Sequence, residues 1–186
     1  MPLNREKFAK FEQRVMETLK GKTALLEVPY YICLYQPKDE LDALECFNNM
    51  VLRLRNKGFS AETIYFSQLM LDSLAESGLL SPEILADEEK TRVELERSVR
   101  NRLPEQIVEG LKNKLADKDI SHCAILLRVG AMYPFVHLKY ILQSIDNIVH
   151  CTLVIPYPSD IGTGHILNET NEDSIEYYRA EVVDLK

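Results

Sequence analysis

The sequence predicts an α/β fold in which a mostly parallel central sheet of about five strands is covered by helices, in a Rossmann-like arrangement of three layers. Short apolar runs, typical of buried strands, alternate along the chain with longer segments whose apolar residues recur at helical spacing. The segment 124–157 shows this best: an apolar run stops at Gly130, an amphipathic segment begins just past Pro134, and a second apolar run covers residues 152–157. Strands separated by helices are joined by crossovers, which make neighbouring strands parallel.

The first third of the chain is expected to form two helices and one strand. Apolar residues at helical spacing predict an amphipathic helix over residues 4–20, which Gly21 ends. Residues 30–35, reading YYICLY, are rich in aromatic and branched side chains and predict the first strand. A second amphipathic helix is expected over residues 39–57, with Gly58 at its end.

The remaining elements follow a long helical insertion. A short apolar run at 63–66 predicts the second strand, and the charged segment of about 67–119 lies between the second and third strands. Proline lacks an N–H group and breaks helices, so Pro82 and Pro104 predict two or three separate helices there. Residues 175–183 predict a final strand, antiparallel to the fourth. A length of 186 residues favours a single α/β domain over residues 1–186.

Charge and hydropathy argue against two classes of partner, nucleic acid and membranes. The chain carries 22 Lys and Arg against 29 Asp and Glu, a formal net charge of -7, which disfavours direct DNA binding because phosphate backbones require a surplus of positive charge. A helix carrying Arg92 to Arg102 is the only segment that suggests such binding. No apolar run reaches the roughly 20 residues that span a bilayer, and the charged start does not resemble a signal peptide. We therefore expect a cytoplasmic protein without membrane contact.

The cysteines predict neither a metal site nor disulfides. Cys33, Cys46, Cys123 and Cys151 are widely separated and form no CxxC pair, and three of them lie in or beside predicted strands. Reduced cysteine packs as a small hydrophobic residue. We expect all four to be reduced and structural.

Several ionisable side chains are expected at the carboxyl edge of the sheet, where open α/β sheets bind ligands. Lys38 and Asp39 follow the first strand, and Asp160 and His165 follow the fourth. An N-cap role for Asp39 is the alternative to a catalytic one. His137 is the remaining histidine at this edge, since His122 and His150 precede their strands.

Histidines and glycine-containing segments are the candidates for metal and cofactor binding. His137 and His165 could converge with Asp39 or Asp160 on iron or zinc, although a histidine in a loop is more often simply solvated. Gly21-Lys22-Thr23 lacks the earlier glycine of a phosphate-binding loop, and Gly162-Thr163-Gly164 is only part of a dinucleotide fingerprint. We therefore expect no bound metal and no cofactor.

Four segments in this order resemble the BrxB family of bacteriophage exclusion (BREX) defence systems. They read VPYYICLYQPKDEL, LLRVGAMYPFVHLKYILQSI, LVIPYPSDIGTGHIL and YYRAEVV, and the resemblance covers about residues 29–183. Its most specific pieces are Gly130 with Pro134-Phe135, the Tyr157-Pro158 turn, and Tyr177-Tyr178-Arg179-Ala180. The resemblance implies a small accessory protein that contacts other BREX proteins, namely a PglZ-type phosphatase-like component and, less directly, the methyltransferase. It supplies no catalytic motif.

Two functional hypotheses follow. The first is a non-enzymatic adaptor subunit of the defence system, which would contact partners through the insertion at 67–119 or through an aromatic surface around Tyr133 and Tyr177. The second is a nucleotide-dependent or nucleic-acid-processing enzyme that uses the crevice at the carboxyl edge. The candidate crevice or partner-contact residues are Lys38, Asp39, Tyr133, His137, Asp160, His165, Tyr177 and Arg179.

Overall fold

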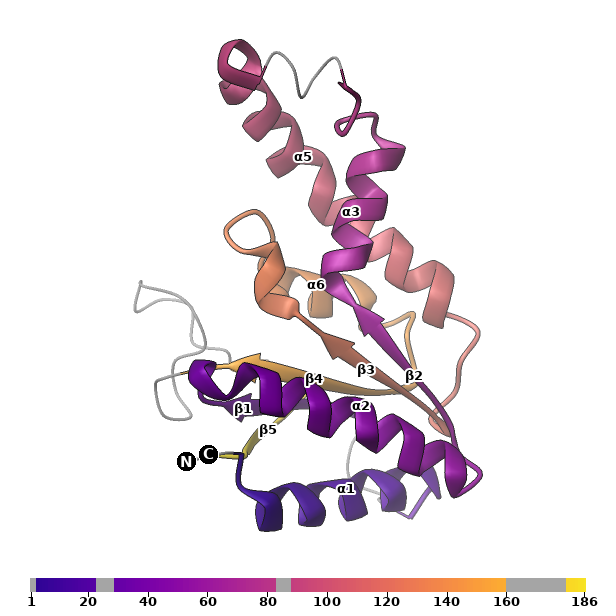
Figure 1. Ribbon diagram of the computed structural model, residues 1–186. Coiled ribbons are helices and arrows are strands. Elements are labelled where there is room, and N and C mark those ends of the chain that lie inside the picture. Colours follow the sequence, from indigo (N-terminus) through magenta and orange to yellow (C-terminus); the bar gives the residue numbers. More distant parts are fainter. Residues whose placement is uncertain (1–2, 23–28, 83–87, 160–179) are drawn as a thin grey trace.

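The computed structural model describes residues 3–22, 29–82, 88–159 and 180–186, and these form a five-stranded sheet with helices on both faces (Figure 1). The strands are β1 (Tyr30–Tyr35), β2 (Ser60–Tyr65), β3 (His122–Leu127), β4 (Thr152–Pro158) and β5 (Ala180–Asp184). Their order in the sheet is β2-β3-β4-β1-β5, and every pairing between them is parallel. The predicted fold class is confirmed.

The helices divide into two groups, one on each face of the sheet. They are α1 (Arg5–Leu19), α2 (Glu40–Asn56), α3 (Phe66–Glu76), α5 (Glu88–Leu115) and α6 (Leu138–Ile145), with short 3₁₀ turns η1 (Pro37–Asp39) and η2 (Val129–Met132). Helices α1 and α2 cover one face (Figure 1), while α3, α5 and α6 contribute to the apolar cluster on the other.

Strand β1 supplies both apolar clusters, because successive side chains in a strand point to opposite faces. Tyr31, Cys33 and Tyr35 pack under α1 and α2, whereas Tyr30, Ile32 and Leu34 pack toward α3, α5 and α6. All six side chains of β1 are buried. The continuous apolar run that predicted this strand is thus the pattern of a strand covered on both faces.

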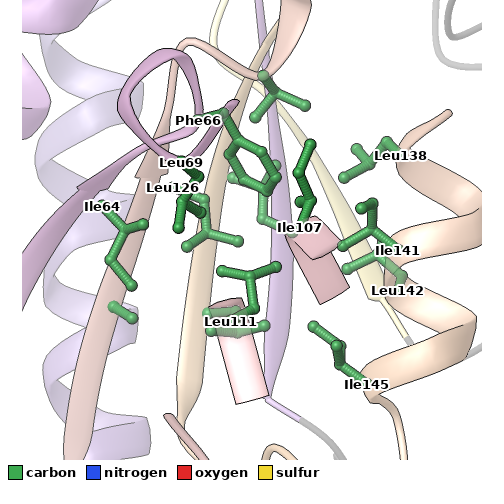
Figure 2. Packing of buried hydrophobic residues seen from close by; sticks show 14 of the residues in the cluster. Ile64, Phe66, Leu69, Ile107, Leu111, Leu126, Leu138, Ile141, Leu142 and Ile145 are labelled. Atoms are coloured by element: carbon green, nitrogen blue, oxygen red, sulfur yellow. The ribbon is translucent and has the colours of Figure 1, made fainter. Parts of the chain in front are cut away.

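The apolar cluster on the face of α3, α5 and α6 includes residues at helical spacing on α5 and α6. Figure 2 shows Ile107 and Leu111 of α5 facing Ile141, Leu142 and Ile145 of α6, above the strands. The first half of α5 extends beyond the sheet together with α3, so that the two helices form a projecting arm (Figure 1). This arm is the outer part of the insertion predicted at 67–119, and the second half of α5 packs on the sheet.

Pro104 does not break the insertion where the sequence predicted a break. It lies inside the continuous helix α5, although its nitrogen cannot donate the usual hydrogen bond to the carbonyl of Arg100. Leu103 and Ile107, on either side of it, are both fully buried against the sheet. We infer that this burial outweighs the missing hydrogen bond.

Three predicted boundaries or directions were also wrong. The last strand runs parallel to β1, not antiparallel to β4, and the residues predicted to begin it, 175–179, lie outside the described residues. Strand β2 begins at Ser60, and Phe66 already belongs to α3. Helix α6 begins only at Leu138, because residues 133–135 form a turn and its N-cap residue, His137, is still extended.

The remaining helix predictions hold. Helix α1 buries Phe8, Phe11, Val15 and Leu19, the residues whose spacing predicted it, and Gly21 follows its end with a positive φ of 67°. Among the helices in the described parts of the chain, none combines the length and the apolar character needed to cross a membrane. Whether the chain is one domain stays a prediction.

The buried face of α5 leads to a stability prediction. Leu111→Ala removes a fully buried side chain from the cluster under α5, so we expect the free energy of unfolding to fall by about 2–5 kcal/mol in urea denaturation. Leu41→Ala is the matched control, since Leu41 is 78% exposed on α2 and its loss should change the stability by less than about 0.5 kcal/mol. Equal effects of the two changes would contradict the assignment of this core.

Candidate functional site

The carboxyl edge of the sheet has a crevice where neighbouring connections leave in opposite directions. Strand β1 leads to α2 on one face of the sheet, while β3 leads to α6 on the other, and β4 lies between them. Such a point of divergence is where open α/β sheets bind ligands. The crevice has a volume of about 290 Å³ and is lined by Tyr35, Pro37, Glu40, Arg128, Val129, Gly130, Ala131 and Pro158.

Three polar side chains meet in this crevice. The hydroxyl of Tyr35 donates a hydrogen bond to Oε2 of Glu40, and Nε of Arg128 lies 3.7 Å from Oε1 of the same carboxylate. Burial and the neighbouring Glu40 carboxylate raise the pKa of Tyr35, because both disfavour a phenolate. The phenol therefore stays a donor at neutral pH, and Glu40 is held between a hydroxyl and a guanidinium.

Arg128 has an unusual backbone conformation directly after β3. Its φ of 60° and ψ of 35° place it in the left-handed region, and it is the only residue other than glycine with a positive φ among those that the structure describes. This conformation costs a residue with a Cβ atom roughly 1 kcal/mol. It turns the chain from the end of β3 into η2, and its side chain is about half exposed at the rim of the crevice.

Of the crevice residues predicted after the first and fourth strands, only Lys38 and Asp39 lie in the described part of the chain. Lys38 and Asp39 form part of η1, and neither lines the crevice, which Glu40 does instead. Asp39 occupies the N-cap position of α2, but its side chain makes no capping hydrogen bond. Asp160, His165 and the Gly162–Gly164 loop lie outside the described residues.

Sequence reasoning missed Glu40 and Arg128 for different reasons. Lys38, Asp39 and Glu40 are consecutive charged residues, and the rotation of the η1 turn decides which of them faces the crevice. That rotation cannot be read from the sequence. Arg128 did carry a usable signal, because it is a charged residue directly after a buried strand, as Lys38 nearly is.

A second groove lies between the arm and the segment before α6. It has a volume of about 370 Å³ and is lined by Arg100, Asn101, Pro104, Glu105, Phe135, Val136, His137 and Tyr140. The guanidinium carbon of Arg100 lies 5.5 Å from the ring centroid of Phe135, within the range of a cation–π contact. Of the predicted contact residues, His137 lines this groove and Tyr133 is 57% exposed two residues before Phe135. Tyr177 and Arg179 lie outside the described residues.

His122 lies at the opposite, amino edge of the sheet, as its position before the third strand predicted. Its Nδ1 lies 2.7 Å from Oγ of Ser60, and its Nε2 lies 2.9 Å from Oε1 of Glu62. Since His122 and Ser60 are direct partners in the pairing of β2 with β3, these contacts fasten the edge strand to the sheet. No group of three or more histidine, cysteine, aspartate or glutamate side chains in the described part of the chain could hold a metal ion.

The four cysteines are buried and unpaired, as predicted. Burial raises the pKa of the Cys151 thiol to about 12, and it also raises the pKa of the thiols of Cys33, Cys46 and Cys123. A raised pKa lowers the fraction of thiolate, which is the reactive form. Cys33, Cys123 and Cys151 therefore pack as apolar groups. Sγ of Cys46, by contrast, also accepts a hydrogen bond from Nη1 of Arg5.

A comparison with protein-family models matches residues 62–183 to the family described as "BREX protein BrxB". The matched region begins in β2 and runs through β5, so it includes the arm, the second groove and Arg128. No curated protein and no solved structure matched the chain.

The buried thiols lead to a prediction about reactivity. In the folded chain at pH 8 we expect Ellman's reagent to modify the four cysteines far more slowly than a solvated thiol of pKa near 8.5, and in urea we expect all four to react rapidly. Because the unfolded chain releases thiol protons that the folded chain retains, these groups stabilise the fold below about pH 8.5 and lose that effect as the pH rises. A rapidly labelled thiol in the folded chain would show that one cysteine is accessible.

Proposed function

Because the chain belongs to the BrxB family and is thus a component of a BREX anti-phage defence system, we propose that it is a non-enzymatic adaptor subunit of that system. In this proposal it assembles with the PglZ-type phosphatase-like component and, less directly, with the methyltransferase. The groove between α5 and the segment before α6 is the main support, and it forms the contact surface.

The groove joins the two surfaces on which partner contact was expected. Arg100, Asn101, Pro104 and Glu105 come from the helical insertion, and the other wall comes from the aromatic segment that begins at Tyr133. The groove thus brings part of the insertion next to the segment that follows Tyr133, which supports a shared contact surface there. Arg100 and Tyr140 in the lining of the groove are about half exposed, so a partner can reach them.

The residues around the groove have the composition of a protein interface. Arg100 stacks on Phe135, Tyr140 is 43% exposed, and Tyr133 is more exposed still. Tyrosine and arginine are enriched among the residues that carry most of the binding energy in interfaces. Farther along the arm, Val93 is also largely exposed, which would extend the apolar contact area.

The alternative is a nucleotide-dependent or nucleic-acid-processing enzyme that uses the carboxyl-edge crevice. The observation in its favour is the carboxylate of Glu40 beside the guanidinium of Arg128 in that crevice. The two functions differ in what a substitution should do. An enzyme would lose phage protection when Glu40 is replaced while assembly stays intact, whereas an adaptor would lose protection together with assembly when the groove is changed.

The groove leads to a prediction about assembly. In cells that express the whole defence cluster, the double variant Arg100→Glu with Tyr140→Ala should recover about tenfold less PglZ-type component in a pull-down of the tagged chain. Both side chains are about half exposed, so the unfolding temperature should change little. A loss of binding would then come from the altered surface and not from unfolding of the chain.

Leu52→Ala provides the matched control, because Leu52 is a half-exposed apolar residue on α2, which covers the opposite face of the sheet. It should leave the recovery of the PglZ-type component unchanged. The proposed surface would be wrong if the double variant retained its partner, and the adaptor role would be wrong if the unaltered chain recovered no BREX protein at all.

A further inference from the structure

We propose that the carboxyl-edge crevice is a binding site for a small ligand that carries an anionic oxygen group, either a phosphate or a carboxylate, next to free hydroxyl groups. Arg128 would hold the anionic group and Glu40 would accept a hydrogen bond from a hydroxyl. The site shares no lining residue with the partner groove, so this proposal does not depend on the adaptor role.

Among the residues that the structure describes, the guanidinium of Arg128 is paired only with Glu40. The 3.7 Å between Nε and Oε1 is too long for a hydrogen bond. Within the described residues the side chain has no hydrogen bond to another group, although a guanidinium carries five N–H donors in a planar fork. That fork matches the oxygens of a phosphate or a carboxylate.

The backbone of Arg128 supports a functional reading of its side chain. Glycine or asparagine would adopt a φ of 60° with less strain, and either would make the same turn out of β3. Strained conformations of this kind persist mainly where the surrounding structure or a ligand uses them. An arginine at this position directs a long cationic side chain to the rim of the crevice.

Glu40 is preoriented to take the neutral part of the ligand. The hydroxyl of Tyr35 occupies Oε2, so Oε1, on the side of Arg128, is left with lone pairs that can accept a donor. One arginine and one glutamate give the lining a formal charge of zero. A neutral lining suits a ligand with one anionic group and several hydroxyls better than a polyphosphate.

The size of the crevice limits the ligand further. A volume of about 290 Å³ is that of roughly ten water molecules and lies at the lower end of the range for ligand sites. It fits a sugar phosphate or a sugar acid but not a dinucleotide. The walls next to the polar groups are apolar, and a Cβ atom added at Gly130 would lie 4.0 Å from Cγ of Pro158, so a methyl group fits there.

The test compares three matched compounds on the full chain: ribose 5-phosphate, ribonate and ribose. We expect at least one of the two anions to raise the unfolding temperature by about 3 °C or more at ten times its dissociation constant, and ribose alone to leave it unchanged. Calorimetric titration then measures affinity, and the two anions separate a phosphate site from a carboxylate site.

Arg128→Asn is the decisive variant, because asparagine tolerates the left-handed conformation and removes the charge. It should weaken binding of the active anion at least tenfold while its unfolding temperature without ligand stays the same or rises. Lys38→Asn removes a charge at the same edge from an exposed residue that does not line the crevice, so binding should be unchanged. Gly130→Ala should weaken binding by narrowing the crevice.

The proposal is overturned if neither anion shifts the unfolding temperature, if ribose alone binds as well, or if Arg128→Asn and Lys38→Asn weaken binding equally. The adaptor role is tested separately, because Arg128→Asn should still recover the PglZ-type component in the pull-down. If the chain binds the anion but recovers no BREX partner, the ligand site is supported and the adaptor role is contradicted.

Discussion

The burial of β1 on both faces and along both edges is the constraint on which the rest of the structure depends. Its six side chains divide between two apolar clusters, and its backbone pairs with β4 on one side and β5 on the other. Parallel neighbours require crossovers, so covering both faces of this one strand determines where the helices lie. The connection from β1 runs past two strands to the edge of the sheet on one face, and the connections from β2 to β3 and from β3 to β4 return on the other, as right-handed crossovers demand.

The same arrangement places the polar chemistry at the ends of the strands. Side chains within β1, β3 and β4 are committed to the clusters, so charged groups can be accommodated only where those strands end and their connections diverge. Glu40 and Arg128 come from different connections and meet because β1 and β3 flank β4. The groove beside the arm has a different origin, since it forms where α5 leaves the sheet and the chain before α6 lies against it.

Periodicity identified the elements of this fold well, because it reports burial. The run at 30–35 and the spacing of Phe8, Phe11 and Val15 were sufficient for their elements. The helix break predicted at Pro104 was wrong because the local effect of the proline is outweighed by the packing of Leu103 and Ile107. Only the tertiary structure reveals that packing. The direction of β5 was misjudged because pairing with β1 rather than β4 is a property of the sheet, not of the segment. For the candidate site the sequence indicated only a region, the carboxyl edge. The rotation of the η1 turn and the backbone of Arg128 decide which of the described residues line the crevice there, and neither can be read from the sequence.

The contacts between α1 and β5 have a consequence for synthesis of the chain. Backbone N–H of Asn4 donates to the carbonyl of Leu185, Arg14 pairs with Glu181, and Leu185 is buried in the same cluster as Phe8 and Phe11. Strand β1 is translated early, but its second edge stays unpaired until residues 180–184 leave the ribosome. An apolar strand with an open edge can pair with other chains. The strand that organises the fold is therefore also the one whose second edge is completed last along the chain.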